Sequence, residues 1–236
     1  MEKLYLLLFL FFTSCLWLKG QDSIASTRLQ FSFIPQLGSI SNGANGGNGK
    51  SGLGYEIEAG MTHQLSQKMG LETGVQLQRA NIKQRSNNLQ WPSDVENGAW
   101  VPGRSYEQLE VNYLSAGLSL GFNLKLTSKK DNQFSFQWSG MLKKVIDFED
   151  NLVINESGHI THDGDIDLDN EVNKFQILLG LGFSYDMVRN HKKTFSIGPS
   201  FEYSVKDLLS SSEPTLLWTY EGGHPFFLGL KITYNL

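Results

Sequence analysis

Apolar and polar residues alternate in run after run of this sequence. In the last run, residues 226–236, every even-numbered position is apolar or aromatic, whereas positions 229, 231, 233 and 235 are glycine or polar. Because side chains of a β-strand point alternately to its two faces, such a run predicts a strand with one apolar face. Seven further runs alternate in the same way. The sequence therefore predicts eight strands, at residues 28–37, 53–65, 70–83, 109–126, 134–148, 174–187, 194–206 and 226–236.

The connections between these predicted strands alternate in length. Those after the second, fourth and sixth strands are short, at residues 66–69, 127–133 and 188–193. The other connections are longer, at residues 38–52, 84–108, 149–173 and 207–225. Short turns on one side and long loops on the other are typical of membrane β-barrels, whose short turns lie in the periplasm. The predicted fold is all-β: an eight-stranded antiparallel up-and-down transmembrane β-barrel, with lipid outside, polar groups inside and both termini in the periplasm.

The fourth predicted strand contains one irregularity. Its second half has apolar residues at even positions from Leu118 to Leu126, but its first half has them at odd positions, in Leu109, Val111 and Tyr113. A one-residue change of phase moves side chains to the other face of a strand. Two explanations follow: a β-bulge near Tyr113, or a strand end that rises above the lipid.

The N-terminus predicts an export signal. Lys3 supplies a positive charge, residues 4–12 are apolar, and Gly20 offers a small residue for cleavage. The apolar core is too short for a membrane-spanning helix. We therefore expect residues 1–20 to be a cleaved signal peptide and residues 21–236 to form the barrel. The single cysteine, Cys15, follows Thr13 and Ser14 in a loose likeness to a lipidation motif, which leaves a lipid anchor as the alternative.

The charge and hydropathy of the chain bear on its partners and its location. The net charge is −4, which argues against nucleic acid as a partner. The mean hydropathy of −0.26 is that of a water-soluble protein. A barrel nevertheless dilutes its lipid-facing residues with interior and loop residues, so this value does not exclude a membrane location.

The C-terminal strand carries a resemblance to a known family. In residues 228–236, Gly229 is followed by apolar or aromatic residues three and five positions later, Ile232 and Tyr234. This pattern is similar to the signal read by the barrel-assembly machinery, although many such strands end in an aromatic residue where this chain has Leu236. The chain resembles the small eight-stranded outer-membrane barrels of Bacteroidetes, similar in plan to the OmpA transmembrane domain. The resemblance implies the outer membrane of a Gram-negative bacterium, with the assembly machinery, lipids and lipopolysaccharide as partners.

The interior of the barrel is predicted to hold charge. Eight strands enclose a space that side chains fill, so we expect no open channel. Glu72 and Lys125 lie near the same end of neighbouring strands and are predicted to pair, as are Glu202 and Lys231. Alternation predicts these inward residues: Glu56, Glu58, Glu72, Gln76, Lys125, Gln137, Lys143, Lys174, Asp186, Glu202 and Lys231.

The connection at residues 149–173 offers a candidate metal site. Carboxylates stand at every second position, in Asp163, Asp165, Asp167 and Asp169. Oxygen ligands suit a hard cation such as calcium, although the spacing is not that of an EF-hand. His159 and His162, beside Asp163, leave a transition metal as a second possibility. The alternative is a solvated acidic loop without a specific ligand.

Catalysis lacks a motif in this sequence. His63 is expected near the periplasmic end of its strand, far from a triad. His224 lies near Glu221 and the serines at 210–212, which makes it the best hydrolytic candidate. We predict that the chain is not an enzyme and that it acts as a structural or interaction protein of the envelope, with a possible envelope protein as partner. The alternatives are a secretion-accessory barrel of the PorT type and a cation or small-ligand binder at the loop face.

Overall fold

The strands of the barrel are long, and in the part of the chain that the structure describes no helix lies between them. The structure, a computed structural model, describes residues 27–41, 49–90, 94–96, 99–101, 105–128, 132–156, 159–162, 172–189, 192–208 and 223–236. The predicted signal peptide at residues 1–20, with Cys15, lies outside these ranges. In the described part, no helix is long and apolar enough to cross a membrane. The strands are β1 (Thr27–Ser41), β2 (Gly49–Gln64), β3 (Met69–Gln90), β4 (Asp94–Glu96), β5 (Ala99–Val101), β6 (Ser105–Ser128), β7 (Asn132–Glu156), β8 (His159–His162), β9 (Phe175–Arg189), β10 (Lys192–Ser204) and β11 (His224–Asn235).

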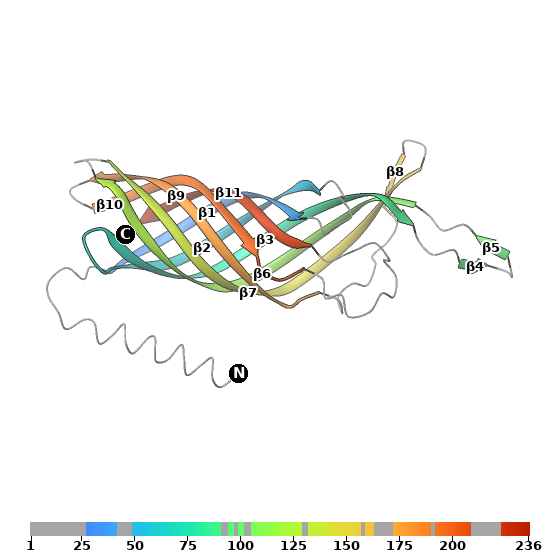
Figure 1. Cartoon of the computed structure of the whole chain (residues 1–236), viewed down its shortest axis with the longest axis horizontal. Helices are drawn as coiled ribbons and strands as arrows, with labels where there is room; N and C mark the ends of the chain where they lie inside the picture. Colours follow the sequence, from blue (N-terminus) through green and yellow to red (C-terminus); the bar gives the residue numbers. More distant parts are fainter. Residues whose placement is uncertain are drawn as a thin grey trace, which may run out of the picture.

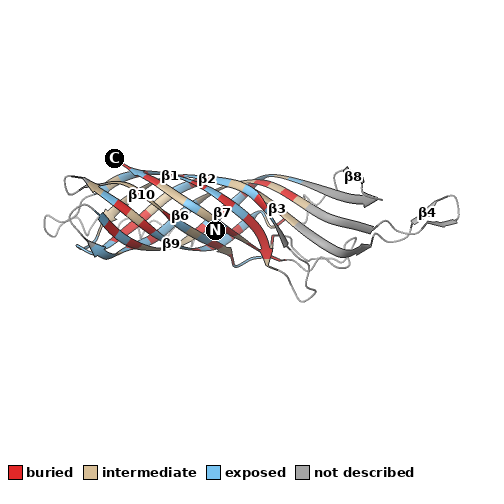
Figure 2. Ribbon diagram, turned by 90° about the horizontal axis from the view of Figure 1, so that it is seen from above, coloured by how far each residue is buried: buried red, intermediate tan, exposed pale blue. Residues whose placement is uncertain are grey.

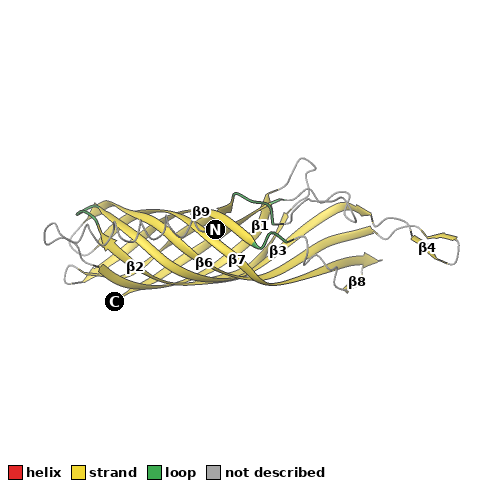
Figure 3. Ribbon diagram, turned by 90° about the horizontal axis from the view of Figure 1, so that it is seen from below, coloured by secondary structure: helices red, strands yellow, loops and turns green. Residues whose placement is uncertain are grey.

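Eight of these strands close into an antiparallel barrel. The order in the sheet is β6-β3-β2-β1-β11-β10-β9-β7, and pairing of β6 with β7 closes the ring. Each neighbour in sequence among these eight is also a neighbour in space, which is the up-and-down arrangement (Figure 1). The wall consists of strand throughout its length (Figure 3). All eight predicted strands are confirmed, and so is the predicted fold class of a closed antiparallel barrel.

Side-chain exposure alternates along the strands (Figure 2). On β2, Ile57 is 48% exposed, whereas its neighbours Glu56 and Glu58 are 0% and 4% exposed. On β11, Leu228 is 54% exposed and the preceding Phe227 only 1%. Because successive side chains point to opposite faces, one face of each strand lines the interior and the other forms the outer surface. Over most of the wall the outer face is the apolar one, as the sequence predicts.

Several strands extend further at the loop end than the sequence predicts. β3 continues to Gln90, β6 begins at Ser105 and β7 continues to Glu156. The expected loops at 84–108 and 149–173 are therefore partly strand, and β4–β5 and β8 add short paired segments there (Figure 1). The physical reason is that ladder hydrogen bonds need no apolar face, so a strand segment without a buried or lipid-facing side shows no alternation.

A bulge near Tyr113 was one of two explanations for the irregularity of β6, but the bulge found there has its extra residue on the partner strand β7. Leu114 of β6 pairs with Asp147 of β7, and the next residue, Ser115, pairs with Val145. Ile146 therefore has no pairing residue on β6. β6 itself keeps its alternation through this point. Tyr113, 2% exposed, therefore lies in the interior, in phase with the inward residues further along the strand.

At the loop end the apolar residues change sides without a break in the strand. Ala80 and Ile82 of β3 are each 1% exposed, and so is Val111 of β6. The positions between them, on the opposite face, carry polar residues. Lys83 forms an ion pair with Glu110, with Nζ and Oε1 2.7 Å apart. At this end the barrel has the apolar-in, polar-out pattern of a protein surrounded by water, which agrees with the expectation that the fourth predicted strand rises above the lipid.

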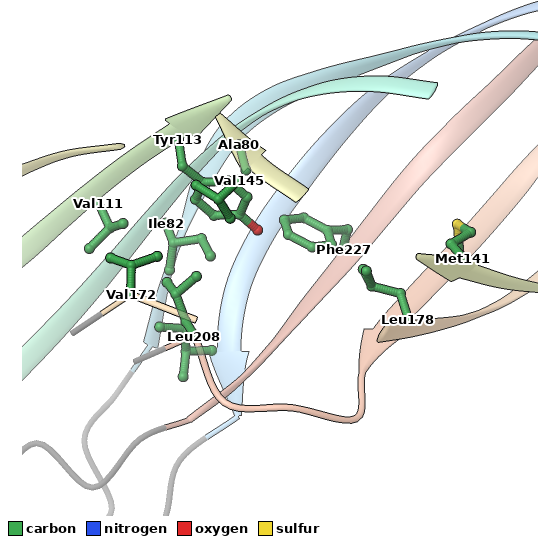
Figure 4. Close-up of a cluster of buried hydrophobic side chains, with 11 residues drawn as sticks. Ala80, Ile82, Val111, Tyr113, Met141, Val145, Val172, Leu178, Leu208 and Phe227 are labelled. Atoms are coloured by element: carbon green, nitrogen blue, oxygen red, sulfur yellow. The ribbon is translucent and has the colours of Figure 1, made fainter. Parts of the chain in front are cut away.

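The inward apolar side chains form a plug in the barrel (Figure 4). Two residues outside the eight strands contribute to it: Val172, which precedes β9, and Leu208, which follows β10. Backbone hydrogen bonds from Asn173 N to Leu208 O (2.9 Å) and from Leu208 N to Gly223 O (3.3 Å) tie these segments together. The sequence prediction of a polar interior missed this plug. Its members are Ile40, Ala80, Ile82, Val111, Tyr113, Met141, Val145, Val172, Leu178, Leu208 and Phe227.

Candidate functional site

Charged side chains gather in the interior of the barrel, between the apolar plug and the end with the short turns. They come from strands that are separated in sequence but adjacent or opposite in the ring. Each occupies an inward position because the alternation of its strand places it there. The acids are Glu56 and Glu58 on β2, Glu72 on β3 and Glu202 on β10, and the bases are Lys143 on β7 and Lys231 on β11.

Lys143 joins two opposite parts of the barrel wall. Its Nζ lies 2.5 Å from Oε2 of Glu56 and 2.9 Å from Oε2 of Glu202. The side chains of Lys143 and Glu56 are fully buried. Charges shielded from water in this way interact strongly, and breaking such a pair by removing one partner is strongly destabilising. Lys143 therefore acts as a brace between β2, β7 and β10.

A second ion pair lies beside the first. Lys231 Nζ donates to Glu58 Oε2 at 2.8 Å, and the Ser119 hydroxyl donates to Glu58 Oε1 at 2.9 Å. Both oxygens of this carboxylate therefore have a donor. The pair links β2 to β11, and Ser119 adds a contact from β6.

The pairing differs from the one predicted from sequence. Glu202 was expected to pair with Lys231, but the structure places Glu202 on Lys143 and Lys231 on Glu58. The register gives the reason. On the β10–β11 ladder Glu202 faces Phe227, whereas Lys231 faces Gly198, four residues before Glu202 on β10.

Glu72 receives its hydrogen bonds from amides. Asn123 Nδ2 donates to Glu72 Oε1 at 3.0 Å, and Gln137 Nε2 approaches the same oxygen at 3.5 Å. Lys125 lies on β6, two residues beyond Asn123 and in phase with it. The expected contact between Glu72 and Lys125 stays a prediction.

Two other predicted interior residues have clear positions. Asp186 is 0% exposed and accepts hydrogen bonds from Ser135 (2.5 Å) and Gln133 (3.2 Å) to Oδ2 and from Ser184 (2.8 Å) to Oδ1. Lys174, in contrast, is exposed and does not line the interior. It precedes the first residue of β9, so strand alternation does not govern its direction.

A small cavity lies among these charged groups. Its volume is about 40 Å³. Glycines and serines from β6, β7, β9 and β10 surround it, because small side chains leave space in the centre of the ring. The polar side chains that line it are Glu56, Glu58, Glu72, Gln76, Ser119, Gln137, Ser139, Ser200, Glu202 and Lys231. At roughly 10–15 Å³ per water position, it has room for about three water-sized groups.

The candidate metal ligands of the acidic loop cannot be placed. Asp163, Asp165, Asp167 and Asp169 lie outside the described residues. His159 and His162 begin and end β8, of which only the backbone is described. In the described ranges, no three His, Cys, Asp or Glu side chains come together as a metal-ligand group.

Among the described residues, Asp207 is an acidic neighbour of the hydrolytic candidate His224. His224 Nδ1 lies 3.5 Å from Asp207 Oδ1, and its ring centroid is 5.5 Å from that of Tyr203. The sequence pointed instead to Glu221 and the serines at 210–212, which lie outside the described residues. His63 contacts the Thr27 hydroxyl at 3.0 Å near the end of β2 that leads into the short turn, which is the end predicted for it.

Comparison with known proteins finds a likeness to solved structures of bacterial β-barrels. No family model and no curated protein matches the chain. Among solved structures, it is similar to Neisserial surface protein A (9% identity, 91% of this chain and 100% of the other, TM-score 0.39). It is also similar to the attachment invasion locus protein Ail of Yersinia pestis (8%, 90% and 99%, TM-score 0.40) and to the N-terminal β-barrel domain of Pseudomonas aeruginosa OprF (8%, 89% and 99%, TM-score 0.30). At such identities and TM-scores the likeness carries no information about activity.

Proposed function

We propose that the chain is an outer-membrane β-barrel without an open channel that has a structural or interaction role at the cell envelope. The observation that carries this proposal is the outer surface of the ring. Leucine, isoleucine, valine and aromatic side chains are exposed on each of the eight strands, including Phe31 (51%), Leu118 (53%) and Leu181 (46%). A water-soluble monomer rarely exposes so continuous an apolar surface, whereas a lipid bilayer covers it.

The interior supports the absence of a channel. Lys143 with its two carboxylates crosses the ring, and the apolar plug fills the space above it. Eight strands leave room for side chains and not for an aqueous pore. With the interior filled, the surfaces left for contact with a partner are the outer wall and the loop end.

The two ends of the barrel support an orientation in the membrane. The C-terminal residue Leu236 lies at the end with the short turns, opposite to β4, β5 and β8 (Figure 1). We place the short turns and both termini in the periplasm and the long connections outside the cell. Lipids and lipopolysaccharide then contact the wall, and the assembly machinery reads β11 during insertion. The Bacteroidetes resemblance, a PorT-type role and the lack of enzymatic activity stay predictions.

Two measurements test the proposal. The chain, expressed in Gram-negative cells with its N-terminal segment, is expected in the outer-membrane fraction, in a folded form that shifts on gels only after boiling. The purified barrel, reconstituted in planar bilayers, is expected to give no reproducible conductance steps. A monodisperse protein in detergent-free buffer would refute the membrane location. Steps of constant size would refute the closed interior.

A further inference from the structure

The cavity below the apolar plug has more negative than positive charge around it. Four carboxylates line it, those of Glu56, Glu58, Glu72 and Glu202. Lys231 also lines it, and Lys143 binds two of the carboxylates from one side. Two positive charges therefore face four negative ones. Burial penalises a charge that lacks a counter-charge, so this excess calls for a further positive group.

Glu72 is where the missing charge is most evident. Its hydrogen-bond donors are the neutral amides of Asn123 and Gln137. Glu58, by contrast, has the ammonium group of Lys231, and Glu56 and Glu202 share that of Lys143. The ammonium group of Lys231 also attracts Glu72, but it already forms an ion pair with Glu58, so one positive charge serves both carboxylates.

Gln76 gives an independent indication that a ligand enters this cavity. Its side chain lines the cavity, is only 7% exposed, and its Oε1 has no hydrogen-bond donor among the described residues. Glu56 Oε1, on a fully buried side chain that also lines the cavity, likewise lacks a donor there. Buried acceptors in folded proteins nearly always have a partner. Two buried oxygens in this cavity therefore lack a hydrogen-bond donor among the described residues, and the same cavity has excess negative charge.

We propose that this cavity binds a small monovalent cation, such as sodium or potassium, among the oxygens of Glu72, Gln76 and their neighbours. Oxygen ligands suit a hard cation. A divalent ion held directly by several carboxylates does not fit, because no three acidic groups in the described part of the chain converge on one point. A cavity of about 40 Å³ accommodates one such ion with a few waters.

An ion exchange on the purified full-length barrel in detergent tests the proposal, independently of where the protein lives. Thermal unfolding is followed by circular dichroism at constant pH and ionic strength, in sodium, potassium or choline chloride. Choline is a quaternary ammonium ion too bulky for the cavity. Because a ligand that binds only the folded state stabilises it, we expect a higher midpoint in sodium or potassium, rising with concentration. Equal midpoints in the three salts would overturn the proposal.

Three variants separate the site from general salt effects. E72Q removes one of the two carboxylate charges that share Lys231, so its midpoint in choline should rise and its dependence on sodium should disappear. Q76L keeps the charge but removes a ligand, so it should weaken the sodium dependence. D147N alters an exposed carboxylate on the outer face of β7 and should leave the difference between sodium and choline unchanged.

A bound proton is the rival explanation, and a titration distinguishes it. If a proton neutralises the excess charge, the midpoint in choline rises as pH falls and sodium adds nothing at any pH, which would refute the cation. If the cation is bound, crystals soaked in thallium(I), a heavy substitute for potassium, should show an anomalous peak in the cavity. Thallium-soaked crystals without that peak would refute it.

Discussion

At the scale of single residues, the sequence predicts the interior position of Lys143 but not its ion-pair partners. Alternation along β7 correctly placed Lys143 in the interior. Its partners come from β2 and β10, 87 and 59 residues away in sequence. Which inward residues meet depends on the tilt and stagger of strands around the ring. A single strand pattern carries no information on stagger, so the charged residues were predictable and their pairing was not.

Replacing Lys143 with methionine should destabilise the barrel strongly. The variant keeps the length of the side chain but leaves Glu56 and Glu202 buried without a counter-charge, and we expect a loss of about 3–5 kcal/mol. Chemical unfolding in detergent micelles measures it. Lys144, the next residue, is exposed on the outer face, so K144M is the matched control and should change stability little. Equal losses in the two variants would contradict the brace.

Tyr113 should tolerate loss of its hydroxyl group. Tyr113 is 2% exposed, and its hydroxyl has no hydrogen-bond partner among the described residues. An unsatisfied buried hydroxyl is unfavourable, so Y113F should leave the stability unchanged or raise it by about 1 kcal/mol. The same unfolding experiment measures the change. A clear loss of stability would mean that the hydroxyl has a partner in the plug.

At the scale of elements, the existence of the eight strands followed from alternation alone. Their ends did not, because β3, β6 and β7 continue into segments such as residues 85–90 where the sequence shows no apolar face. The irregularity at Tyr113 was visible in the sequence, but the sequence did not show which of its two explanations applies. The apolar residues of β6 turn inward without a change of phase, while the bulge occurs at Ile146 of β7.

Deletion of Ile146 should be tolerated. Removing the extra residue brings Val145 and Asp147 into regular pairing with Ser115 and Leu114, and side chains before and after it keep their faces. We expect a folded barrel with a loss of no more than about 1 kcal/mol, the size of a typical mutation. Heat-modifiable migration on gels and circular dichroism report the folded state.

Deletion of Leu142 on the same strand is the matched comparison. No bulge absorbs the missing residue there, so Lys143 would move to the outer face or the register with β6 and β9 would slip. That variant should fail to fold. If both deletion variants fold, or both fail to fold, the bulge does not determine which side chains of β7 point inward.

At the scale of the whole molecule, one ring of strands has two inside-outside patterns. In most of the wall apolar residues face outward around a charged interior. At the loop end Ile82 and Val111 face inward, whereas Lys83 and Glu110 pair on the outer face. The sequence shows this switch in β6 as apolar residues at odd instead of even positions. The prediction of a polar interior failed there because it assumed that one face remained the lipid face along the full strand.

If the switch marks the edge of the bilayer, a charge added to the outer face should have an effect that depends on its height. Leu118 on β6 lies in the apolar wall and Asp147 on β7 is exposed near the switch. L118R should lose about 2–4 kcal/mol, as arginine does near a bilayer midplane, and D147R no more than about 1 kcal/mol, as near an interface. Reversible unfolding from lipid vesicles measures both. In a barrel surrounded by water, neither position desolvates the arginine, so similar small losses would refute the bilayer edge at this switch. Losses that follow the two values would mean that the bilayer edge can be read from the sequence, at the point where the apolar residues of β6 move from one face to the other.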